Sequence, residues 1–479
     1  MIPHANRRRT KIVATVGPTC QSPEMLRALI QAGVNIFRLN FSHGTHDDHA
    51  AIYHRIREQA HAFQEPIAIL ADLCGPKIRV GTFANGSIVL VEGQTVTVTT
   101  RDVLGEPGLI PSRYLALHRD VRPGDRILID DGNLELRVES IADTEITCTV
   151  VTGGILKNRK GMNLPGVAVS SPALTDQDRL DAAFALDLGV DFLALSFVRK
   201  PSDIVDLKHL IAERQLRTPV IAKIEKPEAL SCLDAILAEA DGLMVARGDL
   251  GVEMAPERVP LAQREMLIKA RRACKPVIVA TQMLESMITH PRPTRAEVSD
   301  VSTAVFGGAD AVMLSAETAA GAYPIKSVEM MDRVARQVEQ HQLADGGFSE
   351  LTAGDDEESL SPSLALYQAL ARSTAQLSRD LNVRAVCVRT TKGTSAAVVS
   401  ATRPTAPIIA LTHSETVARR LTLCWGAVPR VISEEEFENP KQAARDQARS
   451  LNLCQEGDYL LLLTGFGKGE PSLTVVPVV

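Results

Sequence analysis

Two short segments of the chain carry residues suited to phosphoryl or metal chemistry. Lys223-Ile-Glu225 places a cation and a carboxylate two residues apart, and the other segment is Ala246-Arg247-Gly248-Asp249. Side chains two residues apart on a strand point to the same side. Two carboxylates with open coordination positions suit Mg2+, which keeps waters and recruits substrate oxygens. Lys223 could then neutralise a phosphoryl group during transfer, whereas a buried structural ion pair would explain the same spacing.

These residues lie at or just beyond the ends of short apolar runs that alternate with amphipathic helical stretches. The eight runs are 11–18, 35–42, 66–73, 191–197, 219–225, 242–248, 276–282 and 311–318. Nearly continuous apolar runs are typical of strands buried on both faces, and their alternation with helices predicts an α/β fold with a parallel (β/α)8 TIM barrel. Each run ends in polar residues, and the carboxyl ends of such strands form the catalytic mouth of the barrel.

Other patterns predict further domains. Residues 76–173 alternate with period two around Asp131-Gly132, which predicts an inserted all-β domain, a β-barrel lid over the mouth. The catalytic barrel is then 1–75 and 174–340. A polar, acidic linker is expected at 341–363, followed by a C-terminal doubly wound α/β regulatory domain at 364–479.

Composition narrows the class of protein. The formal net charge is -6, so nothing calls for a nucleic-acid partner. The eight cysteines are scattered without a C-x-x-C pair. No secretory h-region and no apolar stretch of membrane length is found. We expect a cytoplasmic protein without a membrane partner, and we interpret the basic triplet Arg7 to Arg9 as a solvated terminus.

A family resemblance extends over roughly residues 10–335. The chain contains, in this order, TKIVATVGP, FRLNFSHG, GPKIRVG, DDG, KGMNLPG, AKIEKPEAL, MVARGDLGVE, ATQMLESM, PTRAEVSDVSTAV and MLSAETAAGAYP. Together these strings resemble bacterial-type pyruvate kinase. The resemblance implies transfer of the phosphoryl group of phosphoenolpyruvate to ADP, giving pyruvate and ATP. It also implies Mg2+, with Mn2+ as a substitute, and the homotetramer usual in the family.

The resemblance also implies roles for individual residues. Glu225 and Asp249 match the metal ligands, and Lys223 matches the lysine that stabilises the transferring phosphoryl group. The Thr281 hydroxyl and the backbone N–H groups around Gly248 look like a cradle for the substrate carboxylate. The full expected set of substrate contacts is Arg38, Lys223, Ala246, Arg247, Gly248, Asp249 and Thr281.

Phosphate and proton chemistry adds further candidates. Arg38 looks like a contact to the transferring phosphate, and the expected nucleotide contacts are Asn40, Ser42, His43, Arg79 and Lys160. The enolate left after transfer needs a proton at carbon. Thr281, Ser315 and Glu317 are candidates for a hydroxyl and water relay, although Ser315 and Glu317 could equally be polar rim residues.

One segment departs from the potassium-dependent members of the family. Those members carry Thr where this chain has Leu73, and Glu where it has Lys77. The monovalent-cation pocket of the family corresponds here to Asn40, Ser42, Asp72 and Leu73. We expect the Lys77 ammonium to replace K+, so that the enzyme does not require the ion.

The C-terminal domain contains a candidate effector site. Thr390-Thr391-Lys392-Gly393-Thr394-Ser395 resembles the loop that holds effector phosphates in the family, although a plain turn would explain it too. The final loop, 465–472, is shorter than the one that grips fructose 1,6-bisphosphate. A sugar monophosphate or nucleotide monophosphate effector is therefore as consistent with the sequence as the bisphosphate, and so is insensitivity.

Two other functions fit parts of this pattern. A metal-dependent, enolate-forming barrel aldolase would use the same Glu225 and Asp249, but it has no need for Arg38, Arg79 and Lys160 around a phosphate. A non-catalytic sugar-phosphate-binding regulator would not need the complete catalytic set.

Overall fold

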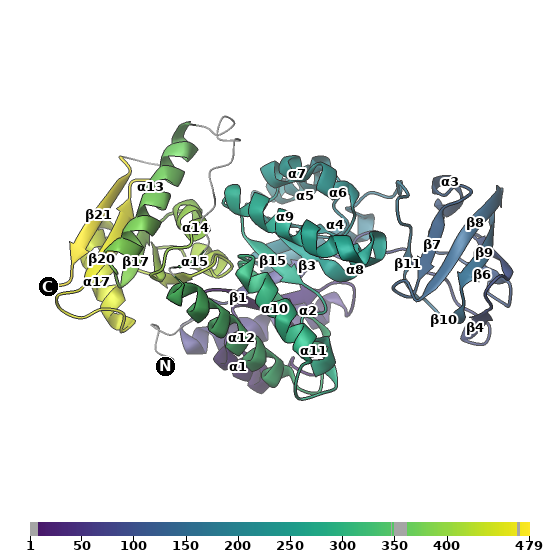
Figure 1. Ribbon diagram of the computed structural model, residues 1–479, viewed down its shortest axis with the longest axis horizontal. Helices are drawn as coiled ribbons and strands as arrows, with labels where there is room; N and C mark the ends of the chain where they lie inside the picture. The colour runs from purple at the N-terminus through teal and green to yellow at the C-terminus, as the bar shows by residue number, and fades with distance from the viewer. Residues whose placement is uncertain (1–7, 346, 349–361, 467–469) are drawn as a thin grey trace.

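The computed structural model describes residues 8–345, 347–348, 362–466 and 470–479. Its three domains lie in a row, with the inserted β domain at one end, the barrel in the middle and the C-terminal domain at the other end (Figure 1). The insertion and the C-terminal domain therefore contact opposite parts of the barrel.

A closed parallel barrel confirms the predicted (β/α)8 fold. Its strand order is β1-β16-β15-β14-β13-β12-β3-β2. The bounds are β1 (Lys11–Thr15), β2 (Ile36–Asn40), β3 (Ala68–Asp72), β12 (Phe192–Leu195), β13 (Val220–Ile224), β14 (Gly242–Ala246), β15 (Val277–Ala280) and β16 (Ala311–Leu314). Nearly every strand residue is buried, because alternate side chains fill the barrel interior and pack under the helices.

Capping residues in the sequence set several helix starts of the barrel. Thr45, Thr175 and Thr294 each form a capping box with the acidic residue three positions later. The helices are α1 (Pro23–Ala32), α2 (His46–Phe63), α4 (Asp176–Leu188), α5 (Pro201–Glu213), α6 (Glu228–Ser231), α7 (Leu233–Glu239), α8 (Arg247–Glu253), α9 (Val259–Arg272), α10 (Arg295–Phe306), α11 (Ala316–Ala319) and α12 (Pro324–Ala344), with 3-10 turns at Pro256–Arg258 and Glu285–Ile288.

The inserted domain is all-β, as predicted, but its pairing gives two sheets rather than one closed barrel. One sheet pairs β4 (Ser87–Leu90) with β10 (Gly154–Lys157). The other has the order β11-β7-β8-β9-β5-β6. Its strands are β5 (Thr95–Thr99), β6 (Leu109–Pro111), β7 (Arg126–Ile129), β8 (Leu134–Ala142), β9 (Glu145–Thr152) and β11 (Met162–Asn163), with helix α3 (Leu117–Asp120) beside them. Both sheets enclose one apolar core.

Two linkers attach this domain to the barrel. In the first, Gly75 has φ +70° and its N–H donates to Asp178 Oδ1 at 3.0 Å. In the second, the Arg199 guanidinium donates to the carbonyls of Val169 and Ser171. Both linkers are thus held by residues of the barrel. The domain boundaries at 75/76 and 173/174 stay predictions.

The C-terminal domain is a five-stranded sheet in the order β19-β18-β17-β20-β21. The strands are β17 (Ala385–Arg389), β18 (Ile408–Thr412), β19 (Ala427–Val431), β20 (Tyr459–Thr464) and β21 (Ser472–Pro477). The helices are α13 (Pro362–Asp380), α14 (Thr394–Ala401), α15 (Glu415–Leu421), α16 (Glu434–Glu438) and α17 (Pro440–Ser450). The last strand, β21, runs antiparallel to β20 and was not expected from the sequence.

The predicted linker and final loop fall partly outside the described residues. Helix α12 continues to Ala344, so the first part of the expected linker 341–363 is helical. Residues 346, 349–361 and 467–469 are not described.

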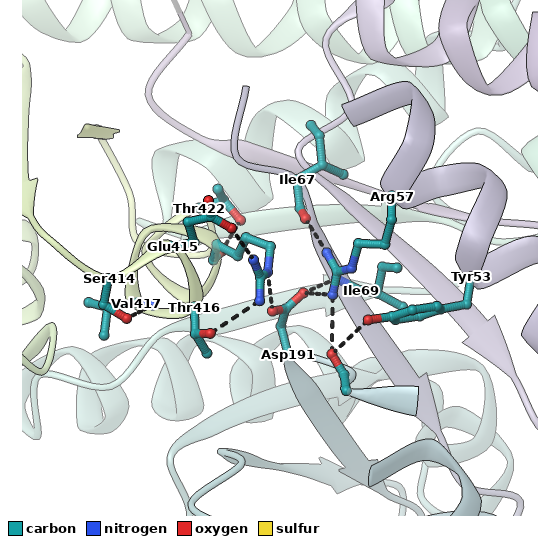
Figure 2. Close-up of polar contacts among 12 residues, drawn as sticks. Tyr53, Arg57, Ile67, Ile69, Asp191, Ser414, Glu415, Thr416, Val417 and Thr422 are labelled. Atoms are coloured by element: carbon teal, nitrogen blue, oxygen red, sulfur yellow. Dashed lines mark hydrogen bonds and ion pairs between the residues drawn. The ribbon is translucent and has the colours of Figure 1, made fainter. Parts of the chain in front are cut away.

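A buried carboxylate joins the barrel to the C-terminal domain (Figure 2). Asp191, just before β12, is 0% exposed. Its Oδ2 accepts from Arg57 of α2 at 2.7 Å, and its Oδ1 accepts from Arg419 of α15 at 2.8 Å. Two arginines from different domains thus neutralise one carboxylate.

The described part of the basic N-terminal triplet, Arg8 and Arg9, is not a solvated terminus. Arg8 is 9% exposed and donates to the Gly33 carbonyl at 2.8 Å. The backbone N–H of Arg9 donates to Glu339 at 2.7 Å, and its side chain donates to the Thr405 carbonyl. These arginines fasten the start of the chain to the barrel and to the C-terminal domain. Arg7 lies outside the described residues.

Across the described ranges, no helix is both long enough and apolar enough to cross a membrane.

Candidate active site

The candidate active site lies where the barrel strands end on the side of the insertion. The insertion leaves the barrel after β3, at the carboxyl end of that strand. The polar residues at or just beyond the strand ends are Arg38 (β2), Asp72 (β3), Ser196 (β12), Lys223 and Glu225 (β13), Asp249 (β14), Thr281 (β15) and Ser315 (β16). The barrel therefore brings together residues that are far apart in sequence.

A chain of alternating charges crosses this mouth. Arg38 Nε donates to Asp72 Oδ2 at 2.6 Å. Lys223 Nζ lies 3.1 Å from Asp72 Oδ1 and 3.0 Å from Glu225 Oε1. The two carboxylates are 1% and 2% exposed. Each buried charge thus has a partner of opposite sign, which offsets its loss of hydration.

These contacts fix the charge of the lysine. Burial by itself would lower the pKa of Lys223, but the carboxylates of Asp72 and Glu225 raise it above its ordinary value. Burial would likewise raise the pKa of Asp72, but Lys223 and Arg38 lower it. The site therefore holds an ammonium group at neutral pH, as stabilisation of a phosphoryl group requires.

Glu225 and Asp249 fit a divalent cation. Burial raises the pKa of Glu225 to about 7; Lys223 opposes this, and the charge of Asp249 adds to it. Two carboxylates that repel each other in a buried site gain stability when a cation lies between them. In the part of the chain that is described, no set of three or more His, Cys, Asp or Glu forms a complete metal site. A cation here would take its other ligands from substrate and water, as Mg2+ does.

The residues expected to hold the substrate carboxylate also lie together. The Gly248 N–H donates to Thr281 Oγ1 at 2.8 Å, and that hydroxyl donates to the Ala280 carbonyl at 2.7 Å. Thr281 has φ 65°, a left-handed conformation that is strained for a β-branched residue. Strain of this kind gathers at sites where geometry matters for function.

Arg247 has a structural task in this arrangement. Its Nη1 pairs with Asp300 Oδ1 at 2.6 Å, and its Nη2 donates to the Thr281 carbonyl at 2.7 Å. Arg247 thus holds Thr281 in its strained conformation. Its predicted contact with substrate, and that of Ala246, stay predictions.

Ser315 and Glu317 differ in surroundings. Glu317 is fully buried, and its two oxygens accept from the backbone N–H groups of Leu284 and Ser315. The Ser315 hydroxyl is buried and, among the described residues, has no hydrogen-bond partner. An unpaired hydroxyl at the mouth suits a proton relay, whereas Glu317 is occupied in holding two loops together.

The expected nucleotide residues lie on two domains. Asn40 Oδ1 accepts from the Ser42 N–H at 3.2 Å at the end of β2. Burial, followed by the positive charges of Arg79, Lys77 and Arg38, lowers the pKa of His43. On the insertion, Lys160 pairs with Asp130 at 2.7 Å. Arg79 and Lys77 therefore act on the same region as His43, while Lys160 is engaged within its own domain.

The expected cation pocket contains Asp72 and Leu73, and the structure shows how both are used. Asp72 binds Arg38 and Lys223, and the Leu73 carbonyl accepts from the Ser196 hydroxyl at 2.6 Å. Lys77 is exposed and lines the cleft between the insertion and the barrel. Its ammonium raises the positive charge of this region.

The residues that line this cleft include Lys77, Asn163, Phe197, Lys226, Asp249 and Glu253. Asn163 of the insertion donates to Glu253 Oε1 at 2.9 Å, and Lys226 pairs with the same oxygen at 2.8 Å. Glu253 ends α8, the helix that carries Asp249. The insertion therefore bonds to the element that positions a candidate metal ligand.

The candidate effector loop lies in the C-terminal domain, on the far side of the barrel from the insertion (Figure 1). It connects β17 to α14, and the Gly393 N–H donates to Thr390 Oγ1 at 3.0 Å. Thr391, Lys392 and Thr394 are exposed. Its side chains are available to an anion, while Thr390 and Ser395 are buried.

One residue of this site, Ser196, was not predicted from the sequence. Ser196 follows β12 and contacts Lys223 Nζ at 2.5 Å. Its position as the first polar residue after an apolar barrel strand was the available signal, which it shares with Thr281.

Comparisons with known proteins agree with the site. A family model described as the barrel domain of pyruvate kinase matches residues 7–328, and one described as its alpha/beta domain matches residues 368–476. A pyruvate kinase of Agrobacterium vitis is 44% identical over 467 residues, which cover 96% of this chain and 94% of the relative. A pyruvate kinase of Geobacillus stearothermophilus is 43% identical and covers 98% of this chain and 79% of its own length.

A solved structure is similar to this chain over its whole length. A crystal structure of a pyruvate kinase from Cryptosporidium parvum superposes with a TM-score of 0.90 at 37% identity, covering 100% of this chain and 98% of that one. The catalytic barrel, the inserted β domain and the C-terminal α/β domain all have their counterparts in this similarity. This chain belongs to the pyruvate kinase family of phosphotransferases.

Proposed function

We propose that Lys223, Arg38, Glu225, Asp249 and Thr281 carry out transfer of a phosphoryl group from phosphoenolpyruvate to ADP with Mg2+, or Mn2+ in its place. The observation that carries this assignment is the Lys223 ammonium, held charged between Asp72 and Glu225 at 3.1 and 3.0 Å. A fixed cation at the point of transfer stabilises the developing charge.

The reaction has three steps, and residues of the site assist each of them. A terminal oxygen of ADP attacks phosphorus, the bond to the enol oxygen breaks, and the enolate is then protonated at carbon to give pyruvate. Arg38 binds phosphoryl oxygens, and Lys223 neutralises charge on the enol oxygen as the bond breaks. Thr281 and the backbone at Gly248 orient the carboxylate, while Ser315 and Thr281 supply the hydroxyls of a proton relay. A divalent cation held by Glu225 and Asp249 would supply further charge neutralisation.

The nucleotide is expected at Asn40, Ser42, His43, Arg79 and Lys160. Support comes from the positive charge that Lys77 and Arg79 place around His43. Closure of the insertion would bring Lys160 towards the mouth. Lys77 takes the place of K+ at the pocket of Asn40, Ser42, Asp72 and Leu73, so that activity does not require the monovalent ion.

Regulation is proposed at residues 390–395. The exposed Thr391, Lys392 and Thr394 suit a phosphate group, and the short final loop suits a monophosphorylated sugar or nucleotide as well as a bisphosphate. We also propose a cytoplasmic homotetramer, as the family resemblance implies. Rates at low phosphoenolpyruvate with sugar monophosphates, fructose 1,6-bisphosphate and nucleoside monophosphates test the effector site. Light scattering tests the assembly.

The central test is pyruvate formation from phosphoenolpyruvate and ADP in Mg2+ buffer, coupled to lactate dehydrogenase. Lys223→Met should lower kcat by about 1,000-fold, because it removes the fixed cation. Lys269→Met is the matched control, since Lys269 pairs with the exposed Asp234 on the outside of the barrel. Full activity in Lys223→Met would exclude the proposed role, and absence of pyruvate formation by the unaltered chain would redirect the search to aldolase substrates or to a regulator.

A further inference from the structure

Among the described residues, three polar side chains contact the Lys223 ammonium. Besides Asp72 and Glu225, its Nζ lies 2.5 Å from Ser196 Oγ. An ammonium group has three N–H donors and no acceptor. The contact with Ser196 has hydrogen-bond geometry, whereas those with Asp72 and Glu225 are ion pairs, so Ser196 is the uncharged partner among the three.

The direction of the hydrogen bonds at Ser196 is fixed. Toward Lys223 the serine oxygen must accept, because the ammonium can only donate. Its hydroxyl hydrogen goes to the Leu73 carbonyl at 2.6 Å, since a carbonyl can only accept. Ser196 is 1% exposed, so water does not compete for these bonds. The carbonyl of Leu73, the residue after β3, thus orients the hydroxyl so that its lone pairs face the lysine.

The next residue holds the neighbouring carboxylate. The Phe197 N–H donates to Glu225 Oε2 at 2.7 Å, and Phe197 has φ 54°, in the left-handed region that is costly for an aromatic residue. This conformation turns the backbone after β12 towards Glu225. One dipeptide therefore contacts both the candidate phosphoryl-stabilising lysine and a candidate metal ligand.

We infer that Ser196 is a positioning residue of the phosphoryl transfer, which fixes the Lys223 ammonium while the adjacent Phe197 N–H fixes Glu225. This inference rests on the proposed function of Lys223. A cation held by Glu225 would compete for one of the three contacts of the ammonium, which leaves Asp72 and Ser196 to hold it. Displacement of a catalytic group by about 1 Å can cost about 100-fold in rate.

The test compares the full-length enzyme with Ser196→Ala and Ser196→Cys. The alanine removes the acceptor, and the cysteine keeps a side chain of similar shape but accepts hydrogen bonds weakly. Both should lower kcat by at least about 10-fold, with KM for phosphoenolpyruvate within about 3-fold of the unaltered value. The dissociation constant for Mn2+ alone, measured by electron paramagnetic resonance, should also stay within about 3-fold, because Phe197 still holds Glu225.

Ser327→Ala is the matched control. Ser327 is a fully buried serine of α12 whose hydroxyl donates to the Tyr323 carbonyl at 2.9 Å, outside the barrel mouth. Its unfolding midpoint should lie close to that of Ser196→Ala, because each change removes one buried hydroxyl, and its kcat should be unaltered. If Ser196→Ala does not fold, Ser196→Cys, which preserves the packing, gives the answer.

Two results would overturn the inference. One is a kcat that falls by less than about 10-fold in either variant. The other is a loss of Mn2+ affinity equal to the loss of kcat, which would mean that the metal site as a whole had collapsed. Lys223→Met is measured in parallel: if it stays active, the proposed function fails, whereas an inactive Lys223→Met with active Ser196 variants rejects this inference alone.

Discussion

Arg419 Nε lies 2.8 Å from Asp191 Oδ1, in an ion pair that links the C-terminal domain to the barrel across 228 residues of sequence. Asp191 immediately precedes β12, and the other end of this strand carries Ser196 and Phe197. The joint between the domains and the turn beside Lys223 thus lie at opposite ends of one short strand.

Removal of the Asp191 side chain should lower the free energy of unfolding more than removal of Arg57 or Arg419. Asp191→Ala leaves Arg57 and Arg419 without their shared partner, and we expect a loss of about 3–5 kcal/mol. Arg419→Ala leaves Asp191 paired with Arg57, and we expect about 1–3 kcal/mol. Fluorescence of Trp425, the single tryptophan, reports unfolding, because it is buried in the C-terminal domain. Arg126→Ala, which removes an exposed pair with Glu135, should stay within about 1 kcal/mol. Equal effects of Asp191→Ala and Arg126→Ala would contradict this account.

Gly75→Ala should impair both stability and catalysis. A Cβ at Gly75 would lie 2.8 Å from Phe197 Cδ2 and 2.9 Å from Ser196 Cβ, and its φ is +70°. We expect a loss of about 2 kcal/mol or more and a reduced kcat, because the added carbon pushes on the turn beside Lys223.

Gly86→Ala is the matched control for this change. Gly86 has φ +78°, but a Cβ there meets nothing within 4 Å. The Gly86→Ala change should lower the free energy of unfolding by about 1–2 kcal/mol through backbone strain, without an effect on kcat. If both alanines reduced kcat equally, the contact with Ser196 and Phe197 would not be the cause.

The pKa of the His43 imidazole should lie below its ordinary value. Burial and the cations Arg79, Lys77 and Arg38 disfavour its protonated form, so His43 is neutral at pH 7. Arg79→Gln removes one positive charge and should raise the pKa, as measured by NMR with His43→Gln to identify the resonance. Arg55→Gln, an exposed change on α2, should leave the pKa unaltered. A lower pKa in Arg79→Gln would have the wrong sign.

Lys77→Glu should create dependence on K+. The change replaces an ammonium by a carboxylate beside the mouth, so a monovalent cation would be needed to restore the charge. We expect activity without K+ to fall by about 10-fold or more and to recover when K+ is added, while the unaltered enzyme responds little. The pKa of His43 should rise in the same variant. An unchanged response to K+ would reject the idea that Lys77 stands in for the ion.

Much of the catalytic architecture follows from local patterns. Eight apolar runs predicted the eight strands of the barrel, because a strand buried on both faces needs continuous apolar sequence. The polar residues at the ends of these runs predicted the mouth. Lys223, Glu225, Asp72 and Arg38 lie together there because the parallel strands of a barrel end at one rim.

Other features required the tertiary structure, because they depend on pairing between distant segments. The two sheets of the insertion and the antiparallel β21 are set by strand order, which local periodicity does not encode. Arg8 looked like part of a solvated terminus and is buried by contacts with Gly33 and Asn35.

The sequence by itself therefore determined the family, the barrel and most of the residue types at its mouth. Only the tertiary structure decided which of these residues touch. The sequence does not distinguish Ser196 from other polar residues, whereas the closed barrel places its oxygen 2.5 Å from Lys223 Nζ. Asp191 and Arg419 likewise form a contact only because the two domains dock. Burial then makes these contacts decisive, because a polar group removed from water must find its partner within the fold.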